Sequence, residues 1–475
     1  MTSTGQVERG PVADRSPLQA GSPPGQDLRA ALDAFAQAGQ LIRVTEPIGW
    51  DFEAAAVLWR LAHGPAVVFE NVTGYDVPIV GNVLNDRGKL AAALGLTVEQ
   101  TQQRIIDAVD RPYPTTLVES APCQQIQVDH DIDLLERFPV PRISEHDGGR
   151  YLSAGVVVAR DPDSGRHNLA IARIQVHPGN RLGCYFAPTH TYQFLQRCRE
   201  LGRPLEVAVV LGSHPALMAA SQLLVPGDEL EHAGGILGQG LQVVRCRTVD
   251  LTVPAGAEIV LEGLIDPTVA ETEGPFGEFP GTYSPQRDNP VIEVQAITMR
   301  ERPLFQMVVG GTHPEHLVTG AVAREATLLR AIRAVVPGAR AAIMPEGGTC
   351  RFHAVVSITK RVEGEGKLAI LAALSNQDLL KRVVVVDDDI DIHDPVQVEW
   401  AIATRMRADD DVVIVPGVKS NPVDPMSRNR TIAKLGIDAT LGLEEARGRL
   451  PRPDVPTDVR QRIDARWDRI MGRDD

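Results

Sequence analysis

The sequence predicts a multidomain protein of mixed class, with a small α/β unit first, a strand-rich domain in the middle and a second α/β domain last. The chain has 475 residues, which is more than a single domain usually holds. Short strands and helices alternate in its first quarter. Strand patterns then dominate from about 116 to 310, and Val/Ile runs separated by helices follow.

The N-terminal part begins with residues 1–26, which are rich in Gly, Pro, Ser and Thr and predict a disordered lead-in. Between Asp27 and Gly39, apolar residues recur at the spacing of an amphipathic helix. We therefore predict an α/β domain over 27–115, with strands at 41–44, 66–69 and 77–80 and helices at 88–94 and 98–110.

A Pro-rich stretch at 112–114 marks the boundary of the central domain, predicted over 116–312. Its strands are alternating or β-branched and are separated by turn residues, which favours an antiparallel barrel or sandwich. The predicted strands cover 153–160, 168–177, 205–211, 241–248, 258–264 and 291–300, with helices over 189–201 and 215–223.

The C-terminal part begins with a linker region at 313–335, in which residues 317–335 predict one helix. An α/β domain follows over 336–450, where continuous Val/Ile strands alternate with helices, as in a mostly parallel sheet covered on both faces. The predicted strands are 354–358, 382–387 and 411–415, and the helices are 366–375 and 395–406. In the tail, 451–475, a charged helix over 455–472 has an apolar face suited to contact with another subunit.

Composition excludes several classes of function. The net charge of −14, with no basic block, argues against general nucleic-acid binding. No apolar run approaches the roughly 20 residues of a membrane span, and the N-terminus has no secretion-signal pattern. The five cysteines are scattered and odd in number, which indicates reduced thiols in a cytoplasmic protein.

The stretch Glu271–Gly281 carries three carboxylates among glycines, prolines and phenylalanines. Gly and Pro disfavour a regular helix or central strand, so we expect a shaped loop. The apolar neighbours Phe276 and Phe279 would desolvate a carboxylate and raise its pKa, as a general acid requires. The alternative is an acidic turn tied down by a salt bridge.

Two cations also stand out. Arg173 ends an apolar strand, and its planar fork suits a carboxylate, either of a substrate or of Glu273; a structural ion pair is the alternative. Lys434 precedes Gly436 and could contact a phosphate or lie on the surface.

Together these segments resemble the UbiD family of reversible decarboxylases, which use prenylated FMN. The similarity extends from about residue 28 to 450. It is carried by Ser153–Val158 and Asn168–Arg173, Pro188–His190, Pro226–Gly235, the Glu-Gly-Pro-Phe-Gly-Glu stretch Glu273–Glu278, Val386–Asp391, Trp400–Arg405 and Lys434–Thr440.

The resemblance implies roles for particular residues. Arg173 and Glu273 would form a pair beside the flavin, on a split β-barrel, and Glu278 would donate the proton to the carbon that loses carbon dioxide. Glu271 lies outside the motif and is interpreted as structural. The cofactor-binding residues would be Ser153, Asn168, Ala170, Ile171, Ala172, Arg173, His190, Glu229 and Lys434.

The same resemblance implies that Asn168, His190 and Glu229 hold a divalent metal ion. Two oxygen donors and one nitrogen suit Mn²⁺ or Mg²⁺ better than Zn²⁺. The ion would bridge to the cofactor phosphate, and K⁺ would accompany it. Without the resemblance, each residue has an ordinary structural interpretation.

The expected function is reversible, non-oxidative decarboxylation of an α,β-unsaturated or (hetero)aromatic carboxylic acid, with a flavin prenyltransferase as cofactor supplier. We expect a homodimer rather than a hexamer. Three alternatives remain: an FMN-dependent oxidoreductase on a split barrel, a non-enzymatic assembly subunit, and a cofactor-free metal lyase.

Overall fold

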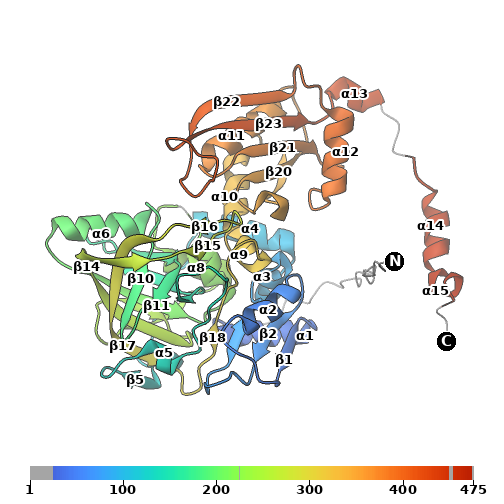
Figure 1. Cartoon of the computed structure of the whole chain (residues 1–475). Coiled ribbons are helices and arrows are strands. Elements are labelled where there is room, and N and C mark those ends of the chain that lie inside the picture. The colour runs from blue at the N-terminus through green and yellow to red at the C-terminus, as the bar shows by residue number, and fades with distance from the viewer. Residues whose placement is uncertain (1–24, 224, 449–452, 473–475) are drawn as a thin grey trace, which may run out of the picture.

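The protein has a large curled sheet with one α/β part beside it and a second α/β part above it, followed by a tail that extends from the body (Figure 1). This computed structural model describes residues 25–223, 225–448 and 453–472. The expected lead-in lies mostly outside the described residues. Its last residue, Gln26, joins the fold, because its side-chain amide donates to Gly240 O at 2.9 Å and accepts from Gln242 N at 2.8 Å.

The N-terminal part is a four-stranded sheet flanked by helices. Its strand order is β1-β2-β3-β18, so the fourth strand comes from far along the chain, after the central sheet. Asp27 caps the first helix and a Thr97–Gln100 capping box starts the fourth. The elements are α1 (Leu28–Gln37), β1 (Leu41–Val44), α2 (Glu53–Arg60), β2 (Ala66–Phe69), β3 (Ile79–Gly81), α3 (Arg87–Leu94), α4 (Val98–Asp110) and β18 (Phe305–Gln306).

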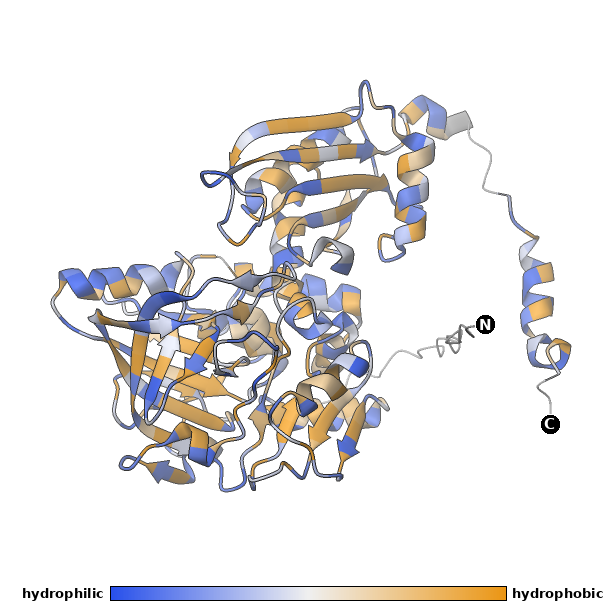
Figure 2. Cartoon of the chain, in the orientation of Figure 1, coloured by the Kyte–Doolittle hydropathy of each residue, from blue (hydrophilic) through white to orange (hydrophobic). Residues whose placement is uncertain are grey.

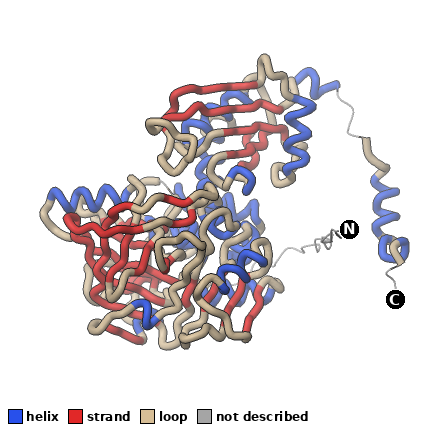
Figure 3. Tube along the Cα trace, in the orientation of Figure 1, coloured by secondary structure: helices blue, strands red, loops and turns tan. Residues whose placement is uncertain are grey.

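The central part is one antiparallel sheet in the order β6-β9-β10-β17-β14-β11-β7-β8, with β5 paired to β17. It curls into an open half-barrel, which confirms the split β-barrel (Figure 3). Its strands are β5 (Ile126–Val128), β6 (Arg150–Leu152), β7 (Val156–Arg160), β8 (His167–Ile171), β9 (Ile174–Val176), β10 (Arg181–Cys184), β11 (Leu205–Leu211), β14 (Ile259–Glu273) and β17 (Arg287–Met299).

Smaller elements surround this sheet. They are the strands β4 (Thr116–Leu117), β12 (Gln242–Arg245), β13 (Thr252–Pro254), β15 (Phe276–Gly277) and β16 (Tyr283–Ser284), and the helices η1 (Pro122–Gln124), α5 (Leu134–Arg137), α6 (His190–Glu200), α7 (Pro215–Ala220) and α8 (Glu229–Leu237).

The strands of the central sheet are largely hydrophobic (Figure 2), and their alternating side chains make both faces apolar. In β7, Val157 packs into the cluster on one face, while Val156 and Val158 pack into the cluster on the other. The second cluster continues through α7 and α8 into the C-terminal part, so these parts share one core.

The C-terminal part has a five-stranded sheet in the order β19-β20-β21-β23-β22. The central strands β20, β21 and β23 are parallel, as predicted, whereas both edge strands run antiparallel. Apolar clusters cover both faces. The elements are α9 (Pro314–Thr319), α10 (Val322–Arg333), β19 (Ala339–Ile343), η2 (Glu346–Gly348), β20 (His353–Ile358), α11 (Glu365–Asn376), β21 (Arg382–Asp387), α12 (Pro395–Arg405), β22 (Val412–Lys419), β23 (Thr431–Ala439), α13 (Leu443–Gly448), α14 (Thr457–Asp464) and α15 (Trp467–Ile470).

Three elements that were predicted to be continuous are each divided into two shorter ones. The helix predicted over 317–335 is two helices, α9 and α10, separated at Gly320–Ala321. The strand predicted over 168–177 is interrupted at Ala172–Arg173. The tail helix predicted over 455–472 is also two short helices, α14 and α15.

The acidic stretch is less of a loop than predicted. Glu271–Glu273 belong to β14, which is much longer than the predicted strand, and only the residues after Glu273 leave it. All five cysteines are free. No helix in the described part of the chain is long and apolar enough to cross a bilayer.

Candidate active site

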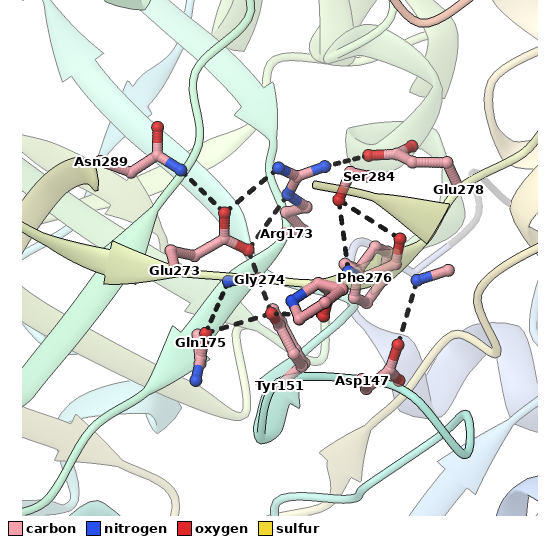
Figure 4. Close-up of polar contacts among 12 residues, drawn as sticks. Asp147, Tyr151, Arg173, Gln175, Glu273, Gly274, Phe276, Glu278, Ser284 and Asn289 are labelled. Atoms are coloured by element: carbon pink, nitrogen blue, oxygen red, sulfur yellow. Dashed lines mark hydrogen bonds and ion pairs between the residues drawn. The ribbon is translucent and has the colours of Figure 1, made fainter. Parts of the chain in front are cut away.

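Arg173 lies between two carboxylates. It occupies the gap between β8 and β9, Glu273 ends β14, and Glu278 follows five residues later (Figure 4). Arg173 Nε and Nη2 each donate to one oxygen of Glu273 at 3.1 Å, and its Nη1 donates to Glu278 Oε1. Its guanidinium also stacks 4.4 Å from the centre of the Tyr185 ring. The structure therefore brings the three predicted catalytic residues together.

Glu273 is the fixed member of this group. It is fully buried and also accepts from Tyr151 Oη at 3.1 Å and Asn289 Nδ2 at 2.8 Å. Burial raises the pKa of Tyr151, so the phenol remains a donor. With every partner donating, Glu273 acts as an anchored acceptor that orients Arg173.

Glu278 is held less fully than Glu273, because its carboxylate has a single side-chain partner among the described residues, the Arg173 guanidinium. Burial raises its pKa, and the Arg173 charge opposes that shift. A carboxyl group whose pKa is raised beside a cavity can hold a proton near neutral pH and deliver it. Both acids form ion pairs with Arg173, and Glu278 also lines the two cavities beside it.

The backbone between the two acids is fastened at several points (Figure 4). Gly274 has a φ of 94°, a conformation that favours glycine, and its N–H donates to Gln175 Oε1 at 2.9 Å. Gly277 N donates to Asp147 Oδ1 at 3.0 Å. These bonds fix the path that separates Glu273 from Glu278.

Glu271 faces other partners. It forms ion pairs with His177 Nδ1 at 2.9 Å and with Arg181. These contacts support its interpretation as a structural residue.

The three predicted metal ligands also converge. Asn168 lies on β8, His190 begins α6 and Glu229 begins α8. His190 Nδ1 is 2.9 Å from Asn168 Oδ1 and 3.8 Å from Glu229 Oε1. Asn168 Nδ2 donates to Thr191 Oγ1 at 2.8 Å, which leaves its oxygen turned towards His190.

The donor set is unusual because one member is an amide. Among the described residues, no group of three or more His, Cys, Asp and Glu side chains could hold a metal ion. Asn168 and Glu229 are buried, and the Glu229 oxygen that does not face His190 accepts from Leu169 N. One imidazole nitrogen with amide and carboxylate oxygens fits a hard divalent ion.

Lys434 is buried, so a surface position is excluded. Its Nζ donates to Leu374 O at 2.9 Å and Gln377 O at 2.7 Å, and burial lowers its pKa. It lines a cavity of about 660 Å³ that also includes Thr189, beside His190. Its third N–H is available to a ligand in that cavity.

Two cavities adjoin Arg173 and Glu278. The smaller, about 200 Å³, is lined by Ser153, Ile171 and Ala172. The larger, about 530 Å³, extends to α9, α10 and the C-terminal part. Both include Arg173 and Glu278, so those side chains lie where the two cavities meet. Ala170 lies half-buried beside Ile171 on β8.

Family models match nearly the whole fold. The central match covers residues 116–313 and is described as the 3-octaprenyl-4-hydroxybenzoate carboxy-lyase Rift-related domain. The N-terminal and C-terminal domains of the same carboxy-lyase match residues 32–109 and 317–439. The chain belongs to the UbiD family.

Solved structures of the UbiD family have the same fold. The UbiD-class enzyme HmfF from Pelotomaculum thermopropionicum, in complex with FMN, superposes with a TM-score of 0.88 at 43% identity, covering 91% of this chain and 98% of that one. An evolved dimeric form of HmfF, in complex with prFMN, gives a TM-score of 0.84 at 41% identity, with 91% and 97% covered.

Curated relatives of the chain include decarboxylases. Anhydromevalonate phosphate decarboxylase from Methanothermobacter thermautotrophicus is 38% identical over 422 residues, covering 88% of this chain and 98% of the relative. Phenolic acid decarboxylase from Bacillus subtilis is 33% identical over 474 residues, with 92% and 97% covered. The chain is accordingly a carboxy-lyase.

Sequence reasoning missed Tyr151 and Asn289, the two neutral donors to Glu273. Tyr151 lies two residues before Ser153 and so shares its face of an extended segment, a weak signal. Asn289 lies opposite Glu271 in the register of β14 and β17, which only the folded sheet reveals.

Proposed function

We propose that the protein catalyses the non-oxidative decarboxylation of an α,β-unsaturated or (hetero)aromatic carboxylic acid with prenylated FMN. The observation that carries the proposal is Arg173 bonded to both Glu273 and Glu278 at the meeting point of two cavities. Hydride transfer by an FMN oxidoreductase requires no such paired carboxylates.

The residues present fit the flavin. The 200 Å³ cavity offers apolar walls from Ile171 and Ala172 and a polar wall from Ser153, as a planar aromatic ring with polar edges requires. When bound, prenylated FMN supplies an electron sink for the pair of electrons left when the carbon–carboxylate bond breaks. Asn168, His190 and Glu229 would hold Mn²⁺ or Mg²⁺ against the cofactor phosphate, with K⁺ nearby, and Lys434 would reach the same phosphate.

Arg173 would position the substrate carboxylate. Three of its five N–H groups are directed at Glu273 and Glu278, so two remain for the substrate. Because Glu273 holds the guanidinium from the buried side, these N–H groups are fixed before substrate binds. Such preorganisation places the leaving carboxylate without reorganisation during the reaction.

Glu278 would supply the proton. After the carbon–carboxylate bond breaks, the carbon that lost carbon dioxide takes the Glu278 proton and a carbon–hydrogen bond forms. Glu278 is then a carboxylate stabilised by Arg173, and it regains a proton from water. In the reverse direction Glu278 is the base that removes the same proton.

The experiment is a screen of unsaturated, aromatic and heteroaromatic acids with protein co-produced with a flavin prenyltransferase. We expect carbon dioxide release from at least one acid and no flavin-dependent oxidation of nicotinamide. Nicotinamide oxidation without carbon dioxide release from any acid would instead establish the oxidoreductase alternative. We further propose that the protein acts as a homodimer in the cytoplasm.

A further inference from the structure

Two arginines line the wall of the 530 Å³ cavity formed by α10 and the segment before β20. They are Arg324, on α10, and Arg351. Arg173 forms ion pairs with two carboxylates. Among the described residues, neither Arg324 nor Arg351 lies within 4.0 Å of a carboxylate oxygen. Burying an unpaired charge costs free energy, so an anion bound at this wall would be stabilised by the two arginines.

Arg324 has unsatisfied donors. Its Nε is buried and has no hydrogen-bond partner. The acid with an electrostatic effect on Arg324 is Asp378, which lines the same cavity. The Asp378 carboxylate also lies near another cation, with its Oδ2 3.8 Å from Lys419 Nζ. Arg324 therefore lines the cavity while at least one of its donors, Nε, is left unused by the described protein.

Arg351 is held in place by neutral groups. It is 7% exposed, and its Nη1 donates to the carbonyls of Leu317 and Cys350, each at 2.9 Å. Its guanidinium lies 5.4 Å from the centre of the Phe279 ring. These contacts orient the side chain but leave its charge uncompensated. Burial, followed by the charge of Arg324, lowers the pKa of Arg351 to about 9.

The break between α9 and α10 makes room for this arginine. A Cβ atom on Gly320 would lie 1.4 Å from Arg351 Nη2, so no other residue fits there while Arg351 keeps its position. Gly320, at which the predicted single helix is broken, thus leaves the space that the Arg351 guanidinium occupies in the cavity wall.

We propose that the substrate carries a second anionic group, a carboxylate or a phosphate, which Arg324 and Arg351 bind while the leaving carboxylate lies at Arg173. This inference rests on the proposed decarboxylation and narrows its substrate to a dianionic acid. The charge of Arg173 is compensated by the ion pairs with Glu273 and Glu278. The charges of Arg324 and Arg351 would be compensated by the second anionic group of the bound substrate.

The test compares matched acids that differ only in a second anion. Suitable pairs are benzoate with terephthalate and cinnamate with 4-carboxycinnamate, and 4-phosphonocinnamate distinguishes phosphate-like groups from carboxylates. We expect the dianion of at least one pair to have a kcat/KM at least 100-fold above its monoanion. A monoanion preferred or equal in every pair would overturn the inference.

Variants assign the effect to the two arginines. Arg324→Met and Arg351→Met should each reduce the preference for the dianion at least tenfold, with monoanion rates and bound flavin unchanged. Arg351→Lys should retain part of the preference. Arg287→Met is the control, because Arg287 lines the same cavity but is exposed. Loss of flavin from the Met variants would show that the arginines serve the cofactor and would overturn the proposal.

Binding separates this inference from the reaction itself. Calorimetric titration of Glu278→Gln protein with each acid measures affinity without turnover. Tighter binding of the dianion, lost in Arg324→Met, supports the second-anion site even if no acid in the panel is decarboxylated. Equal affinity for both members of every pair contradicts it. Arg324→Met is the safer variant, since Arg324 Nε has no hydrogen-bond partner in the described protein, whereas Arg351 Nη1 donates to two carbonyls.

Discussion

Arg173 donates to two carboxylates that are held in different ways, and that difference assigns their roles. Glu273 is surrounded by donors, whereas Glu278 has Arg173 as its charged partner and opens on both cavities. A residue that must change protonation state in each cycle cannot be locked by several donors, so we propose Glu278 as the acid and Glu273 as the residue that supports Arg173.

Replacing Glu278 by Gln should abolish turnover while leaving the flavin bound. The amide keeps the size of the side chain but has no proton to give, so we expect carbon dioxide release to fall at least 10³-fold. Flavin absorbance of the purified variant is the control for cofactor retention. A rate within tenfold of wild type would remove Glu278 from the mechanism.

The pH profile of kcat should decline on its alkaline side. In the proposed mechanism the protonated form of Glu278 is the active one. Because burial raises its pKa, activity should persist to higher pH than an exposed glutamate would allow and should be lost as pH rises through that pKa. Glu278→Asp, with a different depth of burial, should move this limb. A profile that is flat, or that rises across the same range, would contradict the assignment.

At the scale of elements, helix α9 is joined to the N-terminal part by one buried acid. Glu315 is fully buried and accepts from the N–H groups of Asn82, Val83 and Leu84 at 2.9, 2.5 and 3.2 Å. It therefore satisfies the backbone at the end of β3 and holds α9 beside the cavity.

Removing that acceptor should destabilise the protein without touching the site chemistry. Glu315→Ala leaves three buried N–H groups without a hydrogen-bond acceptor, and we expect the free energy of unfolding to fall by about 3–5 kcal/mol. Glu315→Gln, which keeps one acceptor oxygen, should cost less. Urea denaturation measures both. An Ala variant as stable as wild type would show that water can replace the carboxylate.

The sequence predicted most elements but not where they break. Apolar residues continue at helical spacing from Leu317 through Val322, so the local sequence does not indicate a break. The Arg351 guanidinium, which occupies the place of a Cβ atom at Gly320, comes from a later part of the chain. Likewise, the strand pattern runs through Ala172 and Arg173, although the chain leaves the sheet there. A family motif marks the catalytic candidates in the sequence, so Arg173, Glu273 and Glu278 could be predicted. The place of Asn289 beside Glu273 could not, because it follows from the pairing of β14 with β17.

At the scale of the molecule, the tail stands apart from the three packed parts (Figure 1). Helices α14 and α15 bury no residue, and they expose Ile463, Trp467 and Ile470. Large apolar side chains on a projecting charged helix are typical of a contact between subunits. The proposed homodimer gives them a second copy of the chain to cover them.

Deleting residues 453–475 should therefore weaken the dimer and leave the fold intact. We expect light scattering to give a lower mass than for the full chain, with an unchanged melting temperature for the body. The point variant Trp467→Ser should act in the same direction. An unchanged mass in both would show that the tail is not the subunit contact.

The most direct test of decarboxylation with Glu278 as proton donor is the fate of the solvent proton. Holoenzyme incubated in D₂O with an acid that it decarboxylates should give a product with one deuterium on the carbon that lost the carboxylate, as measured by mass spectrometry and NMR. Glu278→Gln should give none. Deuterium incorporation by the Gln variant at the wild-type rate would contradict the central role of Glu278.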